Sequence, residues 1–472
     1  MIALPFTPEW WRLKMSAALD QQTKIVKVLE QYNDGEHPLP SPPQAMNEAV
    51  FVEAKQAFTT LSKLGVTNLM PLVASAPADR LSVRGFRFGE SLGNDKEAWK
   101  IWQRNHMDAD HRLLLDTALV CRNSYALVWP DADGLAEITC EHPSQMVVAY
   151  VAGSRRERAA AFKRWKADDG RLMATLYLPD ALYKWQTQGT RPEYSDANGG
   201  ATWVERHVDG EEWPLPNPFG EVPVVELAVN TGLKARPFGG GVGAFERVIT
   251  IQNRINKGVF DRLVTAEYQA FRQRYSIGYT PPVDPETGQP DPRAVFRNSQ
   301  SRQQAYPKGV TVGEFGQADF TGFMKSFESD VAIMATVSKT PQSYLPLDLK
   351  NLGAETIAQT NIGFIALTKR YRDGFSESLE EIMQLALTVE NNPLAADNQS
   401  QVLWDGIEVH TLGEIVDAAL KMKSLNVPDE VIWAMLPDVS QTDVELWRSQ
   451  RAVADLLAPP AAVQTGGAGG AP

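Results

Sequence analysis

The sequence predicts an α+β protein with several hydrophobic cores, and three observations lead to this class. The chain has 472 residues, and at roughly 150 residues per domain this length suggests about three compact units. Apolar residues make up 43% of the chain and there are 12 tryptophans, so several cores can be filled. Helical and β-like patterns occupy separate stretches of the chain, without the alternation that a parallel sheet requires.

The charge balance argues against a protein that simply coats nucleic acid. The formal net charge is −12, whereas affinity for a duplex depends mainly on Lys and Arg side chains that neutralise phosphates. If DNA is a partner, we therefore expect it to pass along the protein without being held tightly. An acidic wall favours such passage.

Cysteine usage and hydropathy indicate the cellular compartment in which the protein is expected. Cys121 and Cys140 are the two cysteines and have no CxxC spacing, so the sequence supports neither a disulfide scaffold nor a cysteine-based zinc site. A reducing cytosol fits this pattern. The N-terminus has no apolar signal region, and the chain has no apolar run of about 18 residues, so we expect neither export nor a membrane span.

The first half of the chain predicts a helical part followed by a β part. Apolar residues at helical spacing fill 15–29 and 45–64, on either side of a Pro-rich turn at 37–43. Helices are therefore expected over most of 1–120. Between 121 and 230, short β-like runs alternate with turn clusters, which is typical of an antiparallel sheet.

Two long helices are expected to bracket a small module. Apolar residues recur every three or four positions over 245–275, which at 1.5 Å per residue makes a rod of roughly 45 Å. Residues 279–317 are rich in Pro and Gly around short β runs, so a protruding module is expected there. A second helix follows over 321–339.

The C-terminal third predicts a loop, a long helix and a short-helix region. Pro341 and Pro346 prevent helix formation through the loop at 340–353, and the amphipathic pattern resumes from Ala354. Two or three short helices are expected within 410–457. The Gly/Ala/Pro tail at 458–472 is expected to be disordered.

A glycine-rich stretch is the strongest signal for an enzyme. Gly239, Gly241 and Ala244 form a G-x-G-x-x-A pattern before a helix, with Asp261 about 20 residues further on, as in dinucleotide-binding proteins. Ten residues separate the preceding strand from the glycines, however, and no βαβ unit surrounds them. We favour a flexible hinge before the helix.

Two charged clusters have a functional and a structural interpretation. His106, Asp108, Asp110 and His111 could bind a hard metal, but the solvated side of a helix whose apolar side is Leu113, Leu114 and Ala118 is favoured. The basic run at 155–166, interleaved with Phe162 and Trp165, could bind nucleic acid, but a charged surface ribbon or a subunit contact is favoured. Neither a P-loop nor a hydrolase motif stands out, so no catalytic residue, cofactor or metal is predicted.

Several strings of the sequence resemble portal proteins of long-tailed bacteriophages, the head-to-tail connector family. These strings lie in the family's order between about residues 30 and 390. They are YNDGEHPL at 32–39, RLSVRGFR at 80–87, FRQRY with Gly278 at 271–278, TPQSYL with AE at 340–355, and the helical stretch 375–386.

The resemblance implies a portal fold and a structural role. The expected parts are a wing at 1–240 with its β part at 121–230, a stem helix at 241–278, a clip at 279–317, a second stem helix at 318–339, a tunnel loop at 340–353, a long wing helix at 354–405, a helical crown at 406–457 and the tail at 458–472. Such subunits form a ring of usually about twelve copies at the capsid vertex, through which DNA is packaged and ejected and to which the tail attaches.

The same resemblance implies the partners. They are double-stranded DNA in the channel, the terminase large subunit that supplies ATP hydrolysis, a head-completion adaptor, the major capsid protein and a scaffold, with assembly in the host cytoplasm and a final place in the virion. A nucleotide- or metal-dependent enzyme acting on DNA or nucleotides, or another virion neck protein, is the alternative.

Six residues are the expected site residues. Lys339 and Lys350 flank the tunnel loop and are expected to touch DNA phosphates, with Gln342 and Asn351 as neutral contacts. The apolar side chains of the loop, Tyr344, Leu345, Leu347 and Leu349, are expected to pack against a neighbouring copy. Ile255 and Leu263, on the apolar stripe of the first stem helix, are expected at the subunit interface.

Overall fold

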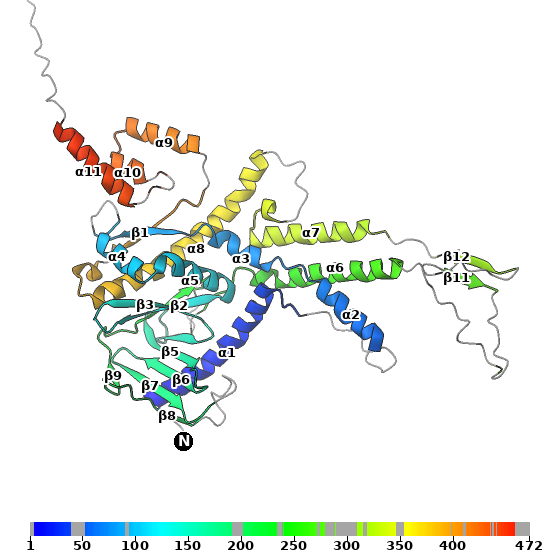
Figure 1. Ribbon diagram of the computed structural model, residues 1–472, viewed down its shortest axis with the longest axis horizontal. Helices are drawn as coiled ribbons and strands as arrows, with labels where there is room; N and C mark the ends of the chain where they lie inside the picture. Colours follow the sequence, from blue (N-terminus) through cyan, green and yellow to red (C-terminus); the bar gives the residue numbers. More distant parts are fainter. Residues whose placement is uncertain are drawn as a thin grey trace, which may run out of the picture.

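The structure is a computed structural model in which an α+β body carries a two-helix projection (Figure 1). It describes residues 4–38, 52–89, 94–190, 202–233, 238, 240–270, 274–278, 288, 309–314, 319–345, 354–397, 399–408, 412–434, 436, 439 and 441–457. Helices and antiparallel strands occupy separate stretches of the chain. The predicted α+β class is therefore confirmed.

The N-terminal helix α1 (Pro8–Asp34) crosses one face of the larger sheet. Thr7 caps its start by accepting a hydrogen bond from the Trp10 amide at 3.3 Å, and Gly35, at φ 82°, ends it in the left-handed conformation. The buried side of α1, including Met15 and Leu19, packs on Phe162 of the sheet. Helices α2 (Val52–Leu64) and α3 (Met70–Ala78) follow.

The larger sheet is antiparallel and has the strand order β4-β5-β6-β7-β8, with β9 also paired to β7. Its strands are β4 (Met146–Tyr150), β5 (Arg158–Lys166), β6 (Leu172–Tyr177), β7 (Ala181–Thr187), β8 (Trp203–Glu205) and β9 (Leu215–Pro216). A second antiparallel sheet has the order β10-β2-β3, with β2 (Asn123–Pro130), β3 (Ala136–Glu141) and β10 (Val224–Ala228).

The central strand β2 is buried on both faces. Ala126 and Val128 face a helical core, whereas Tyr125 and Leu127 face the larger sheet. Successive side chains of a strand point to opposite sides, so a strand covered on both sides is an almost continuous apolar run. The smaller sheet is therefore the middle layer of the body.

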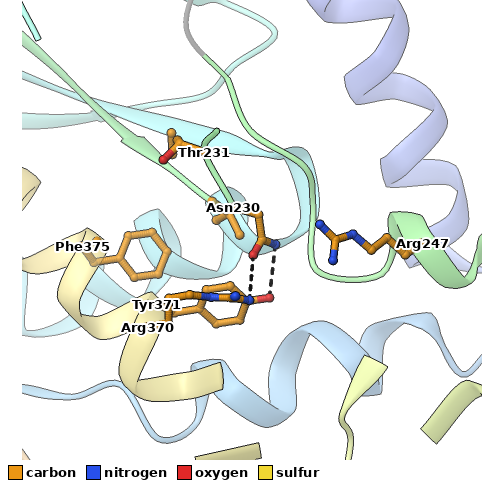
Figure 2. Close-up of a pocket in the computed structure, with 9 residues that line it drawn as sticks. Asn230, Thr231, Arg247, Arg370, Tyr371 and Phe375 are labelled. Carbon is orange, nitrogen blue, oxygen red and sulfur yellow. Dashed lines mark hydrogen bonds between the residues drawn. The ribbon is translucent and has the colours of Figure 1, made fainter. Parts of the chain in front are cut away.

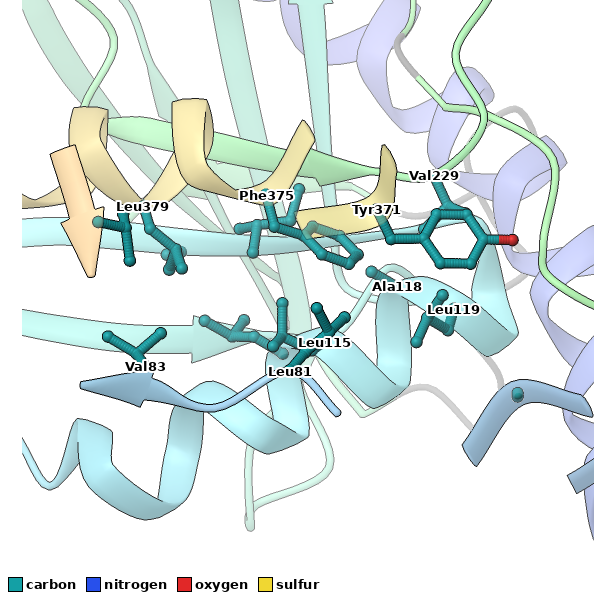
Figure 3. Close-up of a cluster of buried hydrophobic side chains, with 14 of the residues drawn as sticks. Leu81, Val83, Leu115, Ala118, Leu119, Val229, Tyr371, Phe375 and Leu379 are labelled. Carbon is teal, nitrogen blue, oxygen red and sulfur yellow. The ribbon is translucent and has the colours of Figure 1, made fainter. Parts of the chain in front are cut away.

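Two helices close the helical core, α5 (Met107–Cys121) and α8 (Ala354–Val389), and Figure 3 shows side chains of both. They contribute Tyr371, Phe375 and Leu379 from α8 and Leu115, Ala118 and Leu119 from α5. Their spacing of three or four residues places each set on one helix face. Phe375 is only 1% exposed. Helix α4 (Lys96–Arg104) and the strand pair of β1 (Val83–Arg87) with β13 (Gln401–Trp404) flank this core.

The projection consists of α6 (Ile249–Ala270) and α7 (Thr321–Ser338), which lie side by side. A short 3-10 turn, η3 (Glu246–Val248), leads into α6. At the far end, β11 (Arg274–Ile277) pairs antiparallel with β12 (Thr311–Glu314). After α7 comes the 3-10 turn η4 (Gln342–Tyr344).

The C-terminal region contains three helices at the side of the body away from the projection (Figure 1). They are α9 (Leu412–Ser424), α10 (Asp429–Ala434) and α11 (Gln441–Leu457). Trp433 and Trp447 pack edge to face, with ring centroids 5.9 Å apart, and join α10 to α11. The predicted disordered tail at 458–472 lies outside the described residues.

One sequence expectation about an element bound is wrong: the helix expected over 245–275 ends at Ala270 and is followed by strand β11. The segment assigned to the long wing helix, 354–405, contains α8, which ends at Val389, and then η5 (Pro393–Ala396) and strand β13. The mainly helical stretch 1–120 also contains β1, which pairs with β13 from a distant part of the chain.

Candidate functional site

The two helices of the projection are joined by an apolar seam and by an ion pair. Arg254 of α6 contacts Asp330 of α7 at 2.7 Å, and the Asp330 side chain is 13% exposed. The seam consists of buried side chains from both helices: Ile251, Ile255, Val259, Val331, Met334 and Ala335. The projection is therefore a rigid antiparallel pair that belongs to the main core at its base.

Burial corrects one of the two predicted interface residues. Ile255 is only 1% exposed in the single chain, so it packs inside its own subunit and cannot contact a neighbour. Sequence periodicity finds an apolar stripe but does not say whether the same chain or another one covers it. Leu263 is partly buried against the core, and its place at an interface stays a prediction.

Apolar side chains remain exposed on the outer side of α7. Ile333 and Val337, one helical turn apart, are 42% and 46% exposed. Residues four apart lie on the same helix face. The projection thus presents an apolar strip that its own chain leaves open to solvent.

The start of the predicted tunnel loop is tied to the body. Lys339 ends α7 in the left-handed conformation at φ 59°, and Ser338 and Thr340 share a hydrogen bond of 2.8 Å between their hydroxyls. Tyr344 accepts a hydrogen bond from Arg80 at 2.9 Å. Leu345 is 5% exposed, so the expectation that it packs against a neighbouring copy is wrong.

The predicted DNA contacts divide into two groups. Lys339 is exposed beside the loop and Gln342 is partly buried in η4. Lys350 and Asn351 lie outside the described residues, as do most of 279–317. The contact of these four residues with DNA stays a prediction.

A pocket of about 220 Å³ opens between the end of β10, η3 and α8 (Figure 2). Asn230, at φ 50°, directs its amide into this space. The amide donates to the Val242 carbonyl at 3.0 Å and to the Tyr371 hydroxyl at 3.4 Å, and its oxygen accepts from Arg370 at 3.3 Å. Asn favours this backbone conformation more than most residues do.

The pocket has the electrostatics of an anion site. Arg247 and Arg370 are its two charged lining residues. Burial raises the pKa of Tyr371, against the hydrogen bond from Asn230 and the charges of Arg370 and Arg247, which lower it. Guanidinium groups bind carboxylates and phosphates well. Sequence reasoning missed this site, because its residues are far apart in the chain and have no common motif.

The glycine-rich stretch does not form a dinucleotide site. A Cβ atom on Gly241 would lie 1.5 Å from the Val229 carbonyl oxygen, so this glycine is required by tight packing against β10. The Gly240 amide donates to Glu226 at 2.6 Å and the Gly243 amide to Glu246 at 2.5 Å. These two backbone amides therefore donate to carboxylate groups of the protein itself. The role of this stretch as a flexible hinge stays a prediction, and Gly239 lies outside the described residues.

The His/Asp cluster at 106–111 is structural. His111 is buried and contacts the Met107 carbonyl at 2.7 Å, while Trp102 donates to Asp108 at 3.0 Å. Burial lowers the pKa of His111. The prediction of a wholly solvated face is wrong for His111, and Leu113, expected on the apolar side, is 61% exposed.

The basic run at 155–166 is divided between surface and interior. The Arg158 guanidinium lies between the Val222 carbonyl at 3.0 Å, Glu221 at 3.1 Å and Glu381 at 2.5 Å. Arg164, at 1% exposure, contacts Ser16 and Asp20 of α1. The predicted surface ribbon is therefore wrong for these two cations, which one side of β5 directs into the protein, whereas Arg155, Arg156 and Lys166 are exposed.

Three features are typical of a structural protein. Buried ion pairs join the sheets to the helices, and the amides of the glycine-rich stretch donate to carboxylates of the protein itself. The projection of α6 and α7 leaves an apolar strip exposed to solvent. The sequence matches a family described as "Phage portal protein, SPP1 Gp6-like" over residues 15–455. The chain belongs to this family of phage portal proteins, as the sequence strings predict. It is a structural component of a phage virion and not an enzyme.

Similar proteins agree with this family. The chain is 26% identical over 432 residues to the portal protein of Mycobacterium phage D29, covering 87% of this chain and 81% of the relative. It is 25% identical over 434 residues to the portal protein of Mycobacterium phage L5, with the same coverage.

One solved structure, described as the neck of a native GTA particle computed with C12 symmetry, has a TM-score of 0.43 and 12% identity. It covers 87% of this chain and 94% of that chain. Within the described ranges, no helix is long and apolar enough to cross a membrane.

Proposed function

We propose that copies of this chain form a closed ring at the capsid vertex, with the projection of α6 and α7 as the stem of a DNA channel. The observation that carries this proposal is the exposed apolar strip of α7, formed by Ile333 and Val337. Exposed apolar side chains that share one face of a helix are typical of a protein interface. Closed rings use such heterologous contacts, in which each subunit presents different faces to its two neighbours.

The remaining parts follow the order of the chain. The paired strands β11 and β12 at the tip of the projection support assignment of 279–317 to the clip, where the terminase large subunit docks during packaging and the head-completion adaptor afterwards. Residues 1–240 and α8 make the wing, and 406–457 make the crown. About twelve subunits per ring, contacts with the major capsid protein and a scaffold, and assembly in the host cytoplasm belong to the same proposal.

The loop at 340–353 is the proposed narrowest part of the channel. The loop follows the exposed terminus of α7 at Lys339 and precedes the start of α8. Lys339 and Lys350 would form rings of positive charge inside an acidic tube. Phosphate contacts of this kind read no sequence and weaken with salt.

Ring formation through α7 can be tested by placing charge in the strip. The double substitution Ile333→Asp and Val337→Asp should abolish rings, because two buried carboxylates without partners cost several kcal/mol per interface. Leu113→Asp, at an exposed apolar position of the body, is the control and should leave rings intact. Negative-stain images and light scattering measure the outcome, and rings formed normally by the double variant would contradict the assignment of α7.

A charge reversal tests the channel assignment separately. Lys350→Glu should leave ring assembly unchanged but alter DNA packaging or retention in filled heads, with an effect that weakens as salt rises. Packaging that is unchanged at low salt would refute the proposed role of this loop in contacting DNA.

A further inference from the structure

Three potential metal ligands from three different elements meet behind the smaller sheet. Glu30 lies near the end of α1, Cys121 is the last residue of α5, and His142 follows β3. A carboxylate oxygen, the thiol sulfur and a ring nitrogen all lie within 4.8 Å of one another. Among the residues that the structure describes, no other group of three His, Cys, Asp or Glu side chains meets this criterion.

The three donor types are the ones that Zn²⁺ prefers. Zinc binds thiolate sulfur at about 2.3 Å and imidazole nitrogen or carboxylate oxygen at about 2.0 to 2.2 Å, so neighbouring ligand atoms in a tetrahedral site lie roughly 3 to 4 Å apart. His142 Nε2 is 3.2 Å from the Glu30 carboxylate, which is already within this range. Small side-chain rotations would therefore bring all three donors to coordination distance.

The imidazole is oriented from its other side. The Ser144 amide donates to His142 Nδ1 at 3.3 Å, and the Ser144 hydroxyl lies 2.7 Å from the same nitrogen. When Nε2 binds a metal, Nδ1 carries the proton and donates it to the Ser144 hydroxyl in place of accepting from the amide. Histidines that bind metals usually have such an orienting partner.

The Cys121 thiol is buried beside carboxylate groups. Cys121 is 3% exposed, and Glu30 and Asp34 both lie near enough to act on it electrostatically. The same two carboxylates that disfavour a bare thiolate favour a divalent cation beside it. Cys140 differs: its sulfur lies 3.9 Å from the Asp110 carbonyl and belongs to no such group in the described part of the chain.

We propose that Glu30, Cys121 and His142 form a binding site for one zinc-class divalent cation that fastens α1 to α5 and to the turn after β3. On binding, the sulfur–metal bond forms as the thiol proton passes to solvent, and His142 contributes its Nε2 lone pair. Water takes the fourth position. The site lies in the body, so metal binding can be tested independently of ring formation.

The test uses the full chain, stripped with a chelator and titrated with Zn²⁺, or with Co²⁺ as a spectroscopic probe. The wild type should bind about one ion per chain, show thiolate-to-cobalt charge-transfer absorption, and unfold at a higher temperature with metal. Cys121→Ser and His142→Ala should weaken binding more than about a hundredfold, and Ser144→Ala about 10- to 100-fold.

Cys140→Ser is the matched control, because Cys140 is the other cysteine of the chain. It should bind metal like the wild type. No stoichiometric binding by the wild type, or equal losses in Cys121→Ser and Cys140→Ser, would overturn the proposal. If Cys121→Ser fails to fold, the result for His142→Ala decides, since the His142 side chain is 36% exposed and tolerates truncation.

Discussion

Replacing Arg164 with Met should destabilise the wing, because this cation joins α1 to the larger sheet. Its guanidinium is buried and donates to the Ser16 hydroxyl at 2.8 Å and to Asp20 at 2.5 Å. Ser16 is 2% exposed, so the substitution leaves its hydroxyl buried without this partner, at a cost of about 1 to 3 kcal/mol. The Asp20 side chain is 25% exposed, and water compensates part of its loss, leaving about 1 kcal/mol.

Two effects oppose this cost. The Nε atom of Arg164 is buried without a hydrogen-bond partner in the described structure, so its removal is favourable, and Met fills most of the same volume. We therefore expect a net loss of about 2 to 3 kcal/mol in the free energy of unfolding. The double variant Ser16→Ala with Arg164→Met should regain about 1 kcal/mol, because the unpaired hydroxyl is then absent.

Urea titration followed by tryptophan fluorescence is a suitable assay, since Trp11 and Trp185 lie in the cluster between α1 and this sheet. Arg156→Met is the control: Arg156 is exposed, and its substitution should change stability by less than about 0.5 kcal/mol. If the two single variants unfold at the same urea concentration, Arg164 is not the link that its burial indicates.

Three further outcomes follow from buried groups. Phe375→Ala should cost about 3 to 5 kcal/mol of unfolding free energy by leaving a cavity between α8 and α5, measurable by the same titration, and a loss below about 1 kcal/mol would contradict its burial. Burial raises the pKa of Glu226, so the folded protein binds the Glu226 proton more tightly than the unfolded chain does. The contribution of Glu226 to the free energy of unfolding is therefore full below its unfolded pKa of about 4.3 and is lost as pH rises through the raised folded pKa. Glu226→Gln should not show this loss of stability with rising pH, and parallel curves of stability against pH for the two proteins would refute the prediction. Tyr344→Phe should remove the hydrogen bond from Arg80 and speed amide hydrogen exchange in η4, whereas unchanged exchange would show that the bond does not anchor the loop.

The family and the long helices could be predicted from the sequence. The strings from YNDGEHPL to the stretch 375–386 identify the portal family, and the comparisons confirm it. Helices α6, α7 and α8 follow from apolar residues repeated every three or four positions. These signals are local, since each depends on residues within a few turns of one another.

The partners of each element could not be predicted. The pairing of β1 with β13 joins segments about 300 residues apart, and no local pattern encodes it. The same reason explains why the group of Glu30, Cys121 and His142 has no sequence signature.

Periodicity and charge by themselves determined which faces are apolar and which side chains are cationic. Only the tertiary structure decided which of these side chains are covered. Ile255 packs inside its own subunit, Ile333 remains exposed to solvent, and Arg164 is directed into the protein. The physical reason is that burial depends on which surfaces meet in three dimensions, whereas a sequence pattern records only that a surface is suited to be buried.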